Sequence, residues 1–131
     1  MDTIICQGFT YDCSLGFHAN EKGITQKIVV DVEVPVVGAG SKPAHDSELL
    51  MRAGLEPAPT FDYFIANQLI SEFLKTKHFN LIETVGQGVA ELLLEKFDVP
   101  SVKVSVTKRP LDMPNVGCVK YVCERCRGDS M

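Results

Sequence analysis

The chain has 131 residues, of which 45% are apolar and 23% charged, and its formal net charge is −4. This length and composition predict one soluble globular domain, and an acidic chain without a long basic run is a poor partner for nucleic acid or anionic membranes. Because no apolar run approaches the roughly 20 residues that span a bilayer and residues 1–5 lack the features of a signal peptide, we expect a cytoplasmic protein, or an organellar one without its transit peptide.

The first elements form a predicted β-hairpin. Thr3 to Thr10 is expected to be a strand, and a turn containing Glu21 follows it. From Ile24 to Val36 apolar and polar side chains alternate with period two, which indicates a long strand with one face in water. That polar face would carry Lys27, Asp31 and Glu33.

Residues 37–59 interrupt this pattern with several glycines and prolines, which favour a loop. Within it, Asp46 to Ala53 could form a short helix. A connection of this length in a small domain is commonly functional or mobile.

The next segment predicts a helix that is capped by Thr60 and ends near Lys77. Tyr63 falls in its first turn. Its apolar stripe is expected at a spacing of four residues and comprises Phe61, Ile65, Leu69 and Phe73, with Ile70 and Leu74 beside them.

A second helix is predicted to begin after the cap Asn80 and to stop at Pro100. Glu83 lies in its first turn. Gly86 and Gly88 are unusual inside a helix, where each glycine costs about 1 kcal/mol relative to alanine.

Two final strands are predicted at Ser101 to Lys108 and Val116 to Cys123. The fold class is therefore α+β, with a four-stranded antiparallel sheet, two helices on one face and the order strand-strand-helix-helix-strand-strand. We expect a single domain over residues 1–124 that contains the long loop 37–59, followed by a loose tail at 125–131.

The five cysteines are too few and too scattered for a disulfide framework. Cys123 and Cys126 form a lone CxxC, which could begin a zinc site, but no second pair completes it. We favour Cys6, Cys118 and Cys123 as small apolar residues on strands, and we expect no metal.

Four residues on separate elements could together perform acid–base chemistry. Glu21, Tyr63, Glu83 and Lys108 would supply two carboxylates, a phenol and an amine. A carboxylate accepts two parallel N–H bonds, which suits the amino-pyrimidinone edge of a pterin or guanine. A lysine in a partly dry pocket can move protons near neutral pH.

Each of these residues also has a purely structural interpretation. Asn80 and Glu83 have the spacing of a capping box, and a glutamate there complements the helix dipole. Tyr63 could pack its ring and leave its hydroxyl in water. Lys108 could be a solvated charge at a strand end, and Glu21 an ordinary turn residue.

Several separated motifs raise the weight of the chemical interpretation. Gly16, Glu21 and Gln26 follow one another at intervals of five, and Thr60 and Tyr63 form a threonine-x-x-tyrosine segment. Three further segments are Phe79-Asn80-Leu81-Ile82-Glu83-Thr84-Val85, the strand that ends in Lys108, and Val116-Gly117. Together they resemble the dihydroneopterin aldolase family over nearly the whole chain. The resemblance implies the tunnelling fold, in which the sheets of several subunits close into an oligomeric β-barrel ring.

The resemblance also implies roles for the matched positions. Glu83 would anchor the pterin ring, helped by backbone groups at Ile82. Tyr63, with backbone near Phe61, would arrive from a neighbouring subunit. The catalytic residues would be Glu21, Tyr63 and Lys108.

The implied activity is a retro-aldol cleavage of 7,8-dihydroneopterin in folate biosynthesis, which gives 6-hydroxymethyl-7,8-dihydropterin and glycolaldehyde. The family is a carbon–carbon lyase that uses no metal, no cofactor and no lysine Schiff base, because the dihydropterin itself takes up the electrons. Its members form homotetramers or homo-octamers with active sites between subunits.

Two departures from the family pattern keep other functions open. The loop at 37–59 is long, and Arg109 separates Lys108 from Pro110. The dihydroneopterin triphosphate epimerase shares the acid–base residues and would need cations such as Arg109, Lys22 and Lys77. A non-catalytic pterin- or purine-binding ring and a plain oligomeric scaffold are further alternatives.

Overall fold

The structure is a computed structural model that describes residues 2–36, 61–110 and 113–128. The predicted loop at 37–59 and the predicted cap Thr60 lie outside the described residues. The elements are β1 (Asp2–Ser14), η1 (Ala19–Glu21), β2 (Thr25–Val36), α2 (Tyr63–Leu74), α3 (Ile82–Lys96), β3 (Ser101–Lys108) and β4 (Val119–Cys126).

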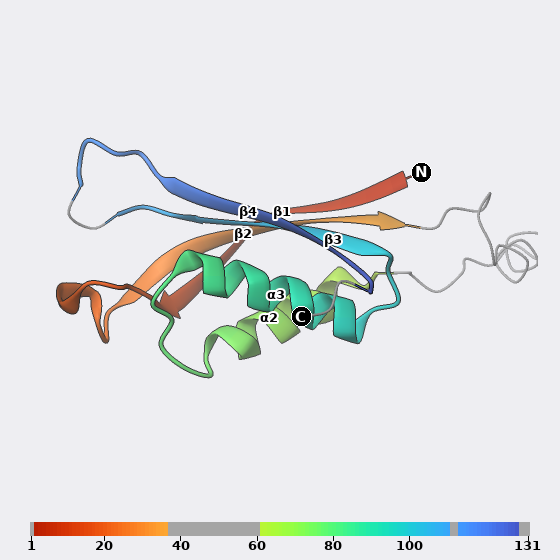
Figure 1. Cartoon of the computed structure of the whole chain (residues 1–131), viewed down its shortest axis with the longest axis horizontal. Helices are drawn as coiled ribbons and strands as arrows, with labels where there is room; N and C mark the ends of the chain where they lie inside the picture. Colours follow the sequence, from red (N-terminus) through yellow and green to blue (C-terminus); the bar gives the residue numbers. More distant parts are fainter. Residues whose placement is uncertain (1, 37–60, 111–112, 129–131) are drawn as a thin grey trace, which may run out of the picture.

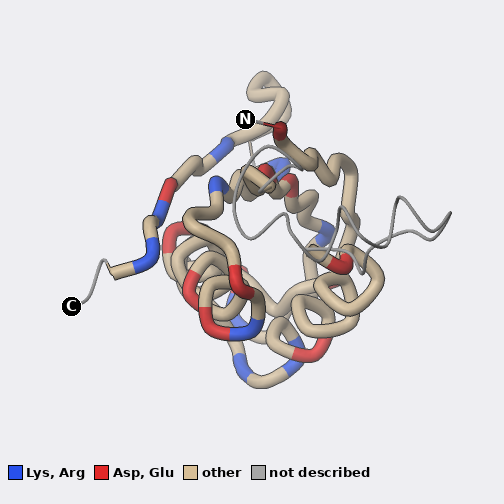
Figure 2. Tube along the Cα trace, turned by 90° about the vertical axis from the view of Figure 1, so that its right-hand side faces the viewer, with Lys and Arg blue, Asp and Glu red and all other residues tan. Residues whose placement is uncertain are grey.

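The four strands form one antiparallel sheet in the order β1-β2-β3-β4. Both helices pack on the same face of this sheet, and the other face is left uncovered (Figure 1). Viewed along the long axis, the helices lie side by side beneath the strands, with acidic and basic residues interspersed over the described part of the chain (Figure 2). The predicted α+β fold class is confirmed. The closure of several sheets into a ring stays a prediction.

The core lies between the sheet and the two helices. Valines from the two central strands alternate inward, and Val30 of β2 sits opposite Val106 of β3 in the antiparallel register. Both side chains are fully buried, as are Val85, Val89 and Leu93 of α3. Burial of each such side chain contributes about 1.5–3 kcal/mol, so the alternating pattern read from the sequence explains why the helices cover this face.

The two glycines inside α3 are explained by aromatic rings that lie against the helix. A Cβ on Gly86 would come within 2.7 Å of the Tyr121 ring, and a Cβ on Gly88 would overlap the ring of Phe73. The Tyr121 hydroxyl also accepts a hydrogen bond from Gln87 Nε2 at 3.2 Å. Close packing against α2 and β4 therefore compensates for the low helix propensity of glycine.

Helix α2 begins at Tyr63, and its N-cap is Asp62. The Asp62 carboxylate accepts hydrogen bonds from the backbone N–H groups of Phe64 and Ile65 at 3.0 and 3.3 Å. The predicted apolar stripe was wrong at Ile65, which is 45% exposed. The buried residues of the helix are Ala66, Ile70 and Leu74, of which Ile70 and Leu74 were expected beside the stripe.

Helix α3 begins at Ile82, and the predicted cap Asn80 was wrong. The N-cap position is occupied by Leu81, and no side chain caps it. Asn80 lies one residue before the N-cap, and its Oδ1 accepts a hydrogen bond from Lys22 Nζ at 2.9 Å. The capping-box interpretation of Glu83 therefore fails, although Glu83 does lie in the first turn of the helix.

The C-terminal end of α3 is fastened by Arg127. Its guanidinium donates hydrogen bonds to the carbonyls of Leu94, Phe97 and Val99 at 2.5–3.1 Å. These carbonyls lie in the last turn of α3 and just after it, where helical hydrogen-bond partners are missing. Strand β4 continues to Cys126, which pairs with Ser101. Residues 125 and 126, expected in the loose tail, are thus part of the sheet.

Three of the cysteines are buried, namely Cys6, Cys13 and Cys123. Burial raises the pKa of each of these thiols, that of Cys13 to about 11. The prediction of buried strand cysteines was wrong for Cys118, which is exposed and precedes β4. Among the described residues, no cluster of histidine, cysteine and acidic side chains could hold a metal ion. No helix in these ranges is long and apolar enough to cross a membrane.

Candidate active site

Glu21 and Lys108 form an ion pair between two distant parts of the chain. Lys108 Nζ lies 3.4 Å from Glu21 Oε2. The side chain of Lys108 is only 14% exposed and that of Glu21 only 9%, so both charged groups are largely buried. Two predicted site residues are thereby brought together, and Lys108 is not the solvated strand-end charge of its structural interpretation.

The inward direction of Lys108 follows from the alternation of β3. Val102, Val104 and Val106 point into the core, and period two places Lys108 on the same face of the sheet. Lys108 is the last residue of the strand and lies opposite Ile28 of β2. Its stem therefore continues the apolar row while its ammonium extends past the core toward the connection between β1 and β2.

Glu21 is held at the end of η1, in that connection. Its Oε1 accepts a hydrogen bond from the His18 backbone N–H at 3.4 Å, and its Oε2 accepts one from Gln26 Nε2 at 3.4 Å. Gly16 packs directly against it, since a Cβ at that position would overlap the Cβ of Glu21. The backbone of Gly16 has φ +156°, which suits glycine.

The charge state of Glu21 follows from these contacts. Burial by itself would raise the pKa of the Glu21 carboxyl, because it penalises the charged form. The Lys108 ammonium, together with hydrogen bonds from His18, Lys108 and Gln26, outweighs burial and holds the pKa below its usual value. Glu21 is therefore a carboxylate at neutral pH.

Gln26 is a member of this cluster that was missing from the predicted site residues. It is 5% exposed, donates Nε2 hydrogen bonds to the Leu15 carbonyl and to Glu21, and leaves its Oε1 without a partner among the described residues. The signal in the sequence was a polar residue on the apolar face of the alternating strand. A buried amide at such a position needs hydrogen-bond partners, and Glu21 is one of them.

Glu83 lies at the same end of the molecule as the ion pair. The segment that leads into α3 is joined to the segment that leads into η1, because Phe79 N donates to Ser14 O at 2.8 Å and Gly16 N donates to Phe79 O at 2.9 Å. Glu83 is exposed in the first turn of α3, next to the half-buried Ile82. Figure 1 shows the start of α3, the end of β3 and the β1–β2 connection at one end of the sheet. A helix N-terminus favours the ionised carboxylate.

Tyr63 lies at the opposite end. Phe61, two residues before it, is buried and packs on Phe97 with 4.7 Å between ring centroids. Phe97 is the C-cap of α3, whereas Glu83 is in the first turn of this helix. About 21 Å of helix, at 1.5 Å per residue, therefore separates Glu83 from Phe97 and from the segment that leads into Tyr63. Within one chain the four predicted residues therefore divide into one group of three and Tyr63 alone. Tyr63 is 62% exposed, and Phe64 beside it 67%.

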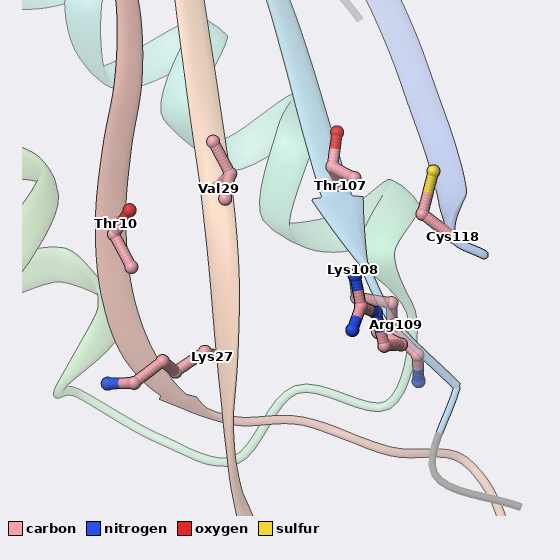
Figure 3. Close-up of a pocket in the computed structure, with 7 residues that line it drawn as sticks. All are labelled: Thr10, Lys27, Val29, Thr107, Lys108, Arg109 and Cys118. Atoms are coloured by element: carbon pink, nitrogen blue, oxygen red, sulfur yellow. The ribbon is translucent and has the colours of Figure 1, made fainter. Parts of the chain in front are cut away.

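A shallow groove of about 360 Å³ adjoins the ion pair on the uncovered side of the sheet. Figure 3 shows Lys108 and Arg109 close together at the end of β3. The Arg109 side chain is anchored there by a hydrogen bond from Nε to the Gly117 carbonyl at 3.2 Å. The remaining lining residues are Thr10, Lys27, Val29, Thr107 and Cys118. The groove thus offers hydroxyl groups and cations, but not the carboxylate of Glu83.

A family model for dihydroneopterin aldolase matches residues 4–124 of the chain. The chain belongs to the dihydroneopterin aldolase family. A relative with that name from Escherichia coli (strain K12) is 26% identical over 108 residues, which cover 82% of this chain and 80% of the relative. The resemblance inferred from the sequence motifs is confirmed.

Solved structures of the dihydroneopterin aldolase family share the fold. A Vibrio cholerae protein assigned to dihydroneopterin aldolase superposes with a TM-score of 0.77 and 28% identity, over 97% of this chain and 98% of that one. The Escherichia coli enzyme in complex with neopterin gives a TM-score of 0.76 and 26% identity, over 95% and 99% of the two chains.

Proposed function

We propose that the protein is a dihydroneopterin aldolase, which cleaves 7,8-dihydroneopterin into 6-hydroxymethyl-7,8-dihydropterin and glycolaldehyde. The observation that carries the proposal is the largely buried Glu21–Lys108 ion pair, which lies at the end of the molecule where α3 begins and Glu83 occupies its first turn. Membership of the family and the neopterin complex of the Escherichia coli relative support it.

In the proposed reaction, Glu21 and Lys108 serve the proton transfers. A base removes the proton of the hydroxyl on the second side-chain carbon, counted from the pterin ring, so that the bond between the first and second side-chain carbons is the one to cleave. The carbon–carbon bond then breaks, glycolaldehyde leaves with its new carbonyl, and the electron pair passes into the dihydropterin. Protonation of the resulting enol-like pterin gives the hydroxymethyl product. A lysine held against a carboxylate in a partly dry site is suited to such transfers.

Substrate recognition is assigned to Glu83. Its carboxylate would accept two N–H bonds from the amino-pyrimidinone edge, and the backbone at Ile82 would add a further contact. The exposure of Glu83, without another partner among the contacts described for it, supports this role, as does its place at a helix N-terminus.

Tyr63 is assigned to a second subunit, with the backbone near Phe61. The helix length between Tyr63 and Glu83 prevents both from contacting one pterin in a single chain. The exposed apolar side chains of Tyr63, Phe64 and Ile65 support a neighbouring subunit at this end. The proposed assembly is a homotetramer or homo-octamer.

The deciding experiment is incubation with 7,8-dihydroneopterin, followed by detection of glycolaldehyde and of 6-hydroxymethyl-7,8-dihydropterin. Stoichiometric release of both would support the aldolase, and absence of both would overturn it. The same incubation distinguishes the sister activity, because an epimerase converts the substrate or its triphosphate into a diastereomer without releasing glycolaldehyde.

The Lys108→Met variant tests the assigned chemistry. Turnover should fall by roughly 10²–10⁴, the usual contribution of a general acid or base, while binding of neopterin is retained. Borohydride added during wild-type turnover should trap no covalent adduct on Lys108. An adduct there would replace the proposed mechanism with a Schiff-base mechanism.

A further inference from the structure

His78 joins the two segments that meet beside Glu21. Its Nδ1 lies 2.7 Å from Ser14 Oγ, and its Nε2 lies 2.9 Å from the Gly16 carbonyl oxygen. A carbonyl only accepts hydrogen bonds, so Nε2 carries a proton and donates. In the neutral ring Nδ1 then accepts the hydroxyl proton of Ser14. The half-buried imidazole thus bridges residues 14 and 16 across the chain.

The bridged segment is also fixed by its backbone. Phe79, the residue after His78, donates its N–H to Ser14 and accepts the N–H of Gly16. The carbonyl of Leu15, between them, accepts from the buried Gln26 amide. Residues 14 to 16 are therefore hydrogen-bonded both to residues 78–79 and to Gln26. The imidazole binds the Gly16 carbonyl, just before the chain turns toward η1.

This segment determines where the Glu21 carboxylate lies. The Cβ of Glu21 packs where a Gly16 side chain would be. Two residues beyond Gly16, the His18 N–H donates to Glu21 Oε1. Gln26 binds both Leu15 and Glu21. A displacement of Gly16 would therefore move the contacts that orient Glu21 toward Lys108.

We propose that His78 is a positioning residue, which holds the Gly16 backbone so that Glu21 remains paired with Lys108 for proton transfer. The role in turnover rests on the proposed function, whereas the role in orienting Glu21 does not. His78 contacts neither Glu21 nor Lys108 in the described contacts, and it acts through Ser14 and Gly16.

The test compares His78→Leu with His78→Gln. Leucine fills similar space without hydrogen bonds, whereas the glutamine amide carries an acceptor and a donor on one carbon, as Nδ1 and Nε2 flank one ring carbon. His78→Leu should lower kcat by roughly 10- to 100-fold, the cost of a small misplacement of a catalytic group. Binding of neopterin should stay at the wild-type level, because Glu83 is untouched. His78→Gln should recover most of the lost kcat.

A second measurement separates the failure of this inference from a failure of the proposed function. The Glu21 carboxyl is titrated by carbon NMR in the wild type and in His78→Leu, and its pKa should be higher in the variant. Ser14→Ala should also lower kcat and raise the pKa of Glu21, by smaller amounts than His78→Leu. It replaces His78→Leu in the test if that variant fails to fold. An unchanged Glu21 titration in the variants overturns the inference, as does an equal loss of kcat in His78→Leu and His78→Gln. A wild type that releases no glycolaldehyde overturns the function and leaves the titration to decide on His78.

Discussion

Among single residues, Glu83 could serve pterin recognition or only the structure of α3, and one substitution distinguishes the two roles. Because no capping contact involves it, Glu83→Gln should leave the free energy of unfolding nearly unchanged. The amide presents a donor where the pterin also donates, so one of two charge-assisted hydrogen bonds is lost, at a cost of about 2–3 kcal/mol in binding. Calorimetric titration with neopterin measures this. Binding equal to that of the wild type would remove Glu83 from the site.

The Glu21–Lys108 pair should also govern how stability depends on pH. The pKa of Glu21 in the folded protein lies below its usual value of about 4.3. Ionised Glu21 therefore stabilises the fold above that pH, and this contribution is lost as the pH falls through the folded-state pKa. In Lys108→Met the cation is absent, burial dominates and the pKa of Glu21 rises, so ionisation then destabilises the fold.

Urea unfolding of the wild type and Lys108→Met over a pH series measures this difference. The gap in unfolding free energy should be smallest near pH 3 and should reach about 3 kcal/mol near pH 6, as expected when one partner of a buried pair is removed. Lys103→Met is the matched control, because Lys103 lies on the same strand but is exposed on the other face. If the difference in unfolding free energy were the same at every pH, the ion pair would not be the cause of the stability loss at low pH.

The sequence predicted these residues unevenly. Lys108 could be placed, because the strict alternation of β3 fixes the face on which its last residue lies. The partner of Lys108 was not predictable from periodicity, because η1 and β3 meet only through the tertiary fold. Gln26 stood out as a polar residue in an apolar row, whereas His78 gave no local signal, since its partners lie 62 and 64 residues away.

At the level of elements, the glycines of α3 control how closely the helix approaches the sheet. Gly86→Ala would gain about 1 kcal/mol of helix propensity. The added Cβ would meet the Tyr121 ring at 2.7 Å, and such overpacking costs about 1–3 kcal/mol. We therefore expect a net loss of stability, measured by thermal and urea unfolding.

A double-mutant cycle isolates the contact with the ring. In a Tyr121→Ala background the obstacle is absent, so the same Gly86→Ala change should become stabilising. If the alanine destabilised both backgrounds equally, the helix–sheet spacing would have another cause than this ring.

Element types were predictable and element ends were not. Period two identified β2 and β3, and helical spacing identified α2 and α3. The helix starts were misjudged: Asp62 provides the cap of α2, and the N-cap of α3 is Leu81, without a side-chain cap. For α2 the apolar pattern included the buried Ile70 and Leu74 but not the exposure of Ile65, which depends on how the helix packs on α3 and β1.

For the whole molecule, the division of the site between two ends of the chain predicts subunit complementation. Tyr63→Phe and Glu83→Ala proteins should each be inactive. After they are dissociated together and reassembled, about one site in four should combine an intact Tyr63 with an intact Glu83 and regain activity. The measurement is glycolaldehyde release by the reassembled mixture, with each variant reassembled alone as the control. A fully active monomer in sedimentation would contradict the shared site.

The length of α3 has a consequence for how such an enzyme must be handled and regulated. Tyr63 starts α2 near the C-terminal end of α3, whereas Glu83 lies in the first turn of α3. A single chain in the proposed assembly therefore carries two half-sites and no whole one. Dilution would then inactivate the protein as an inhibitor does, and turnover per chain would rise with protein concentration until the subunits are saturated with one another. Under the proposed assembly, the cellular amount of the protein determines the fraction of complete sites as well as their number.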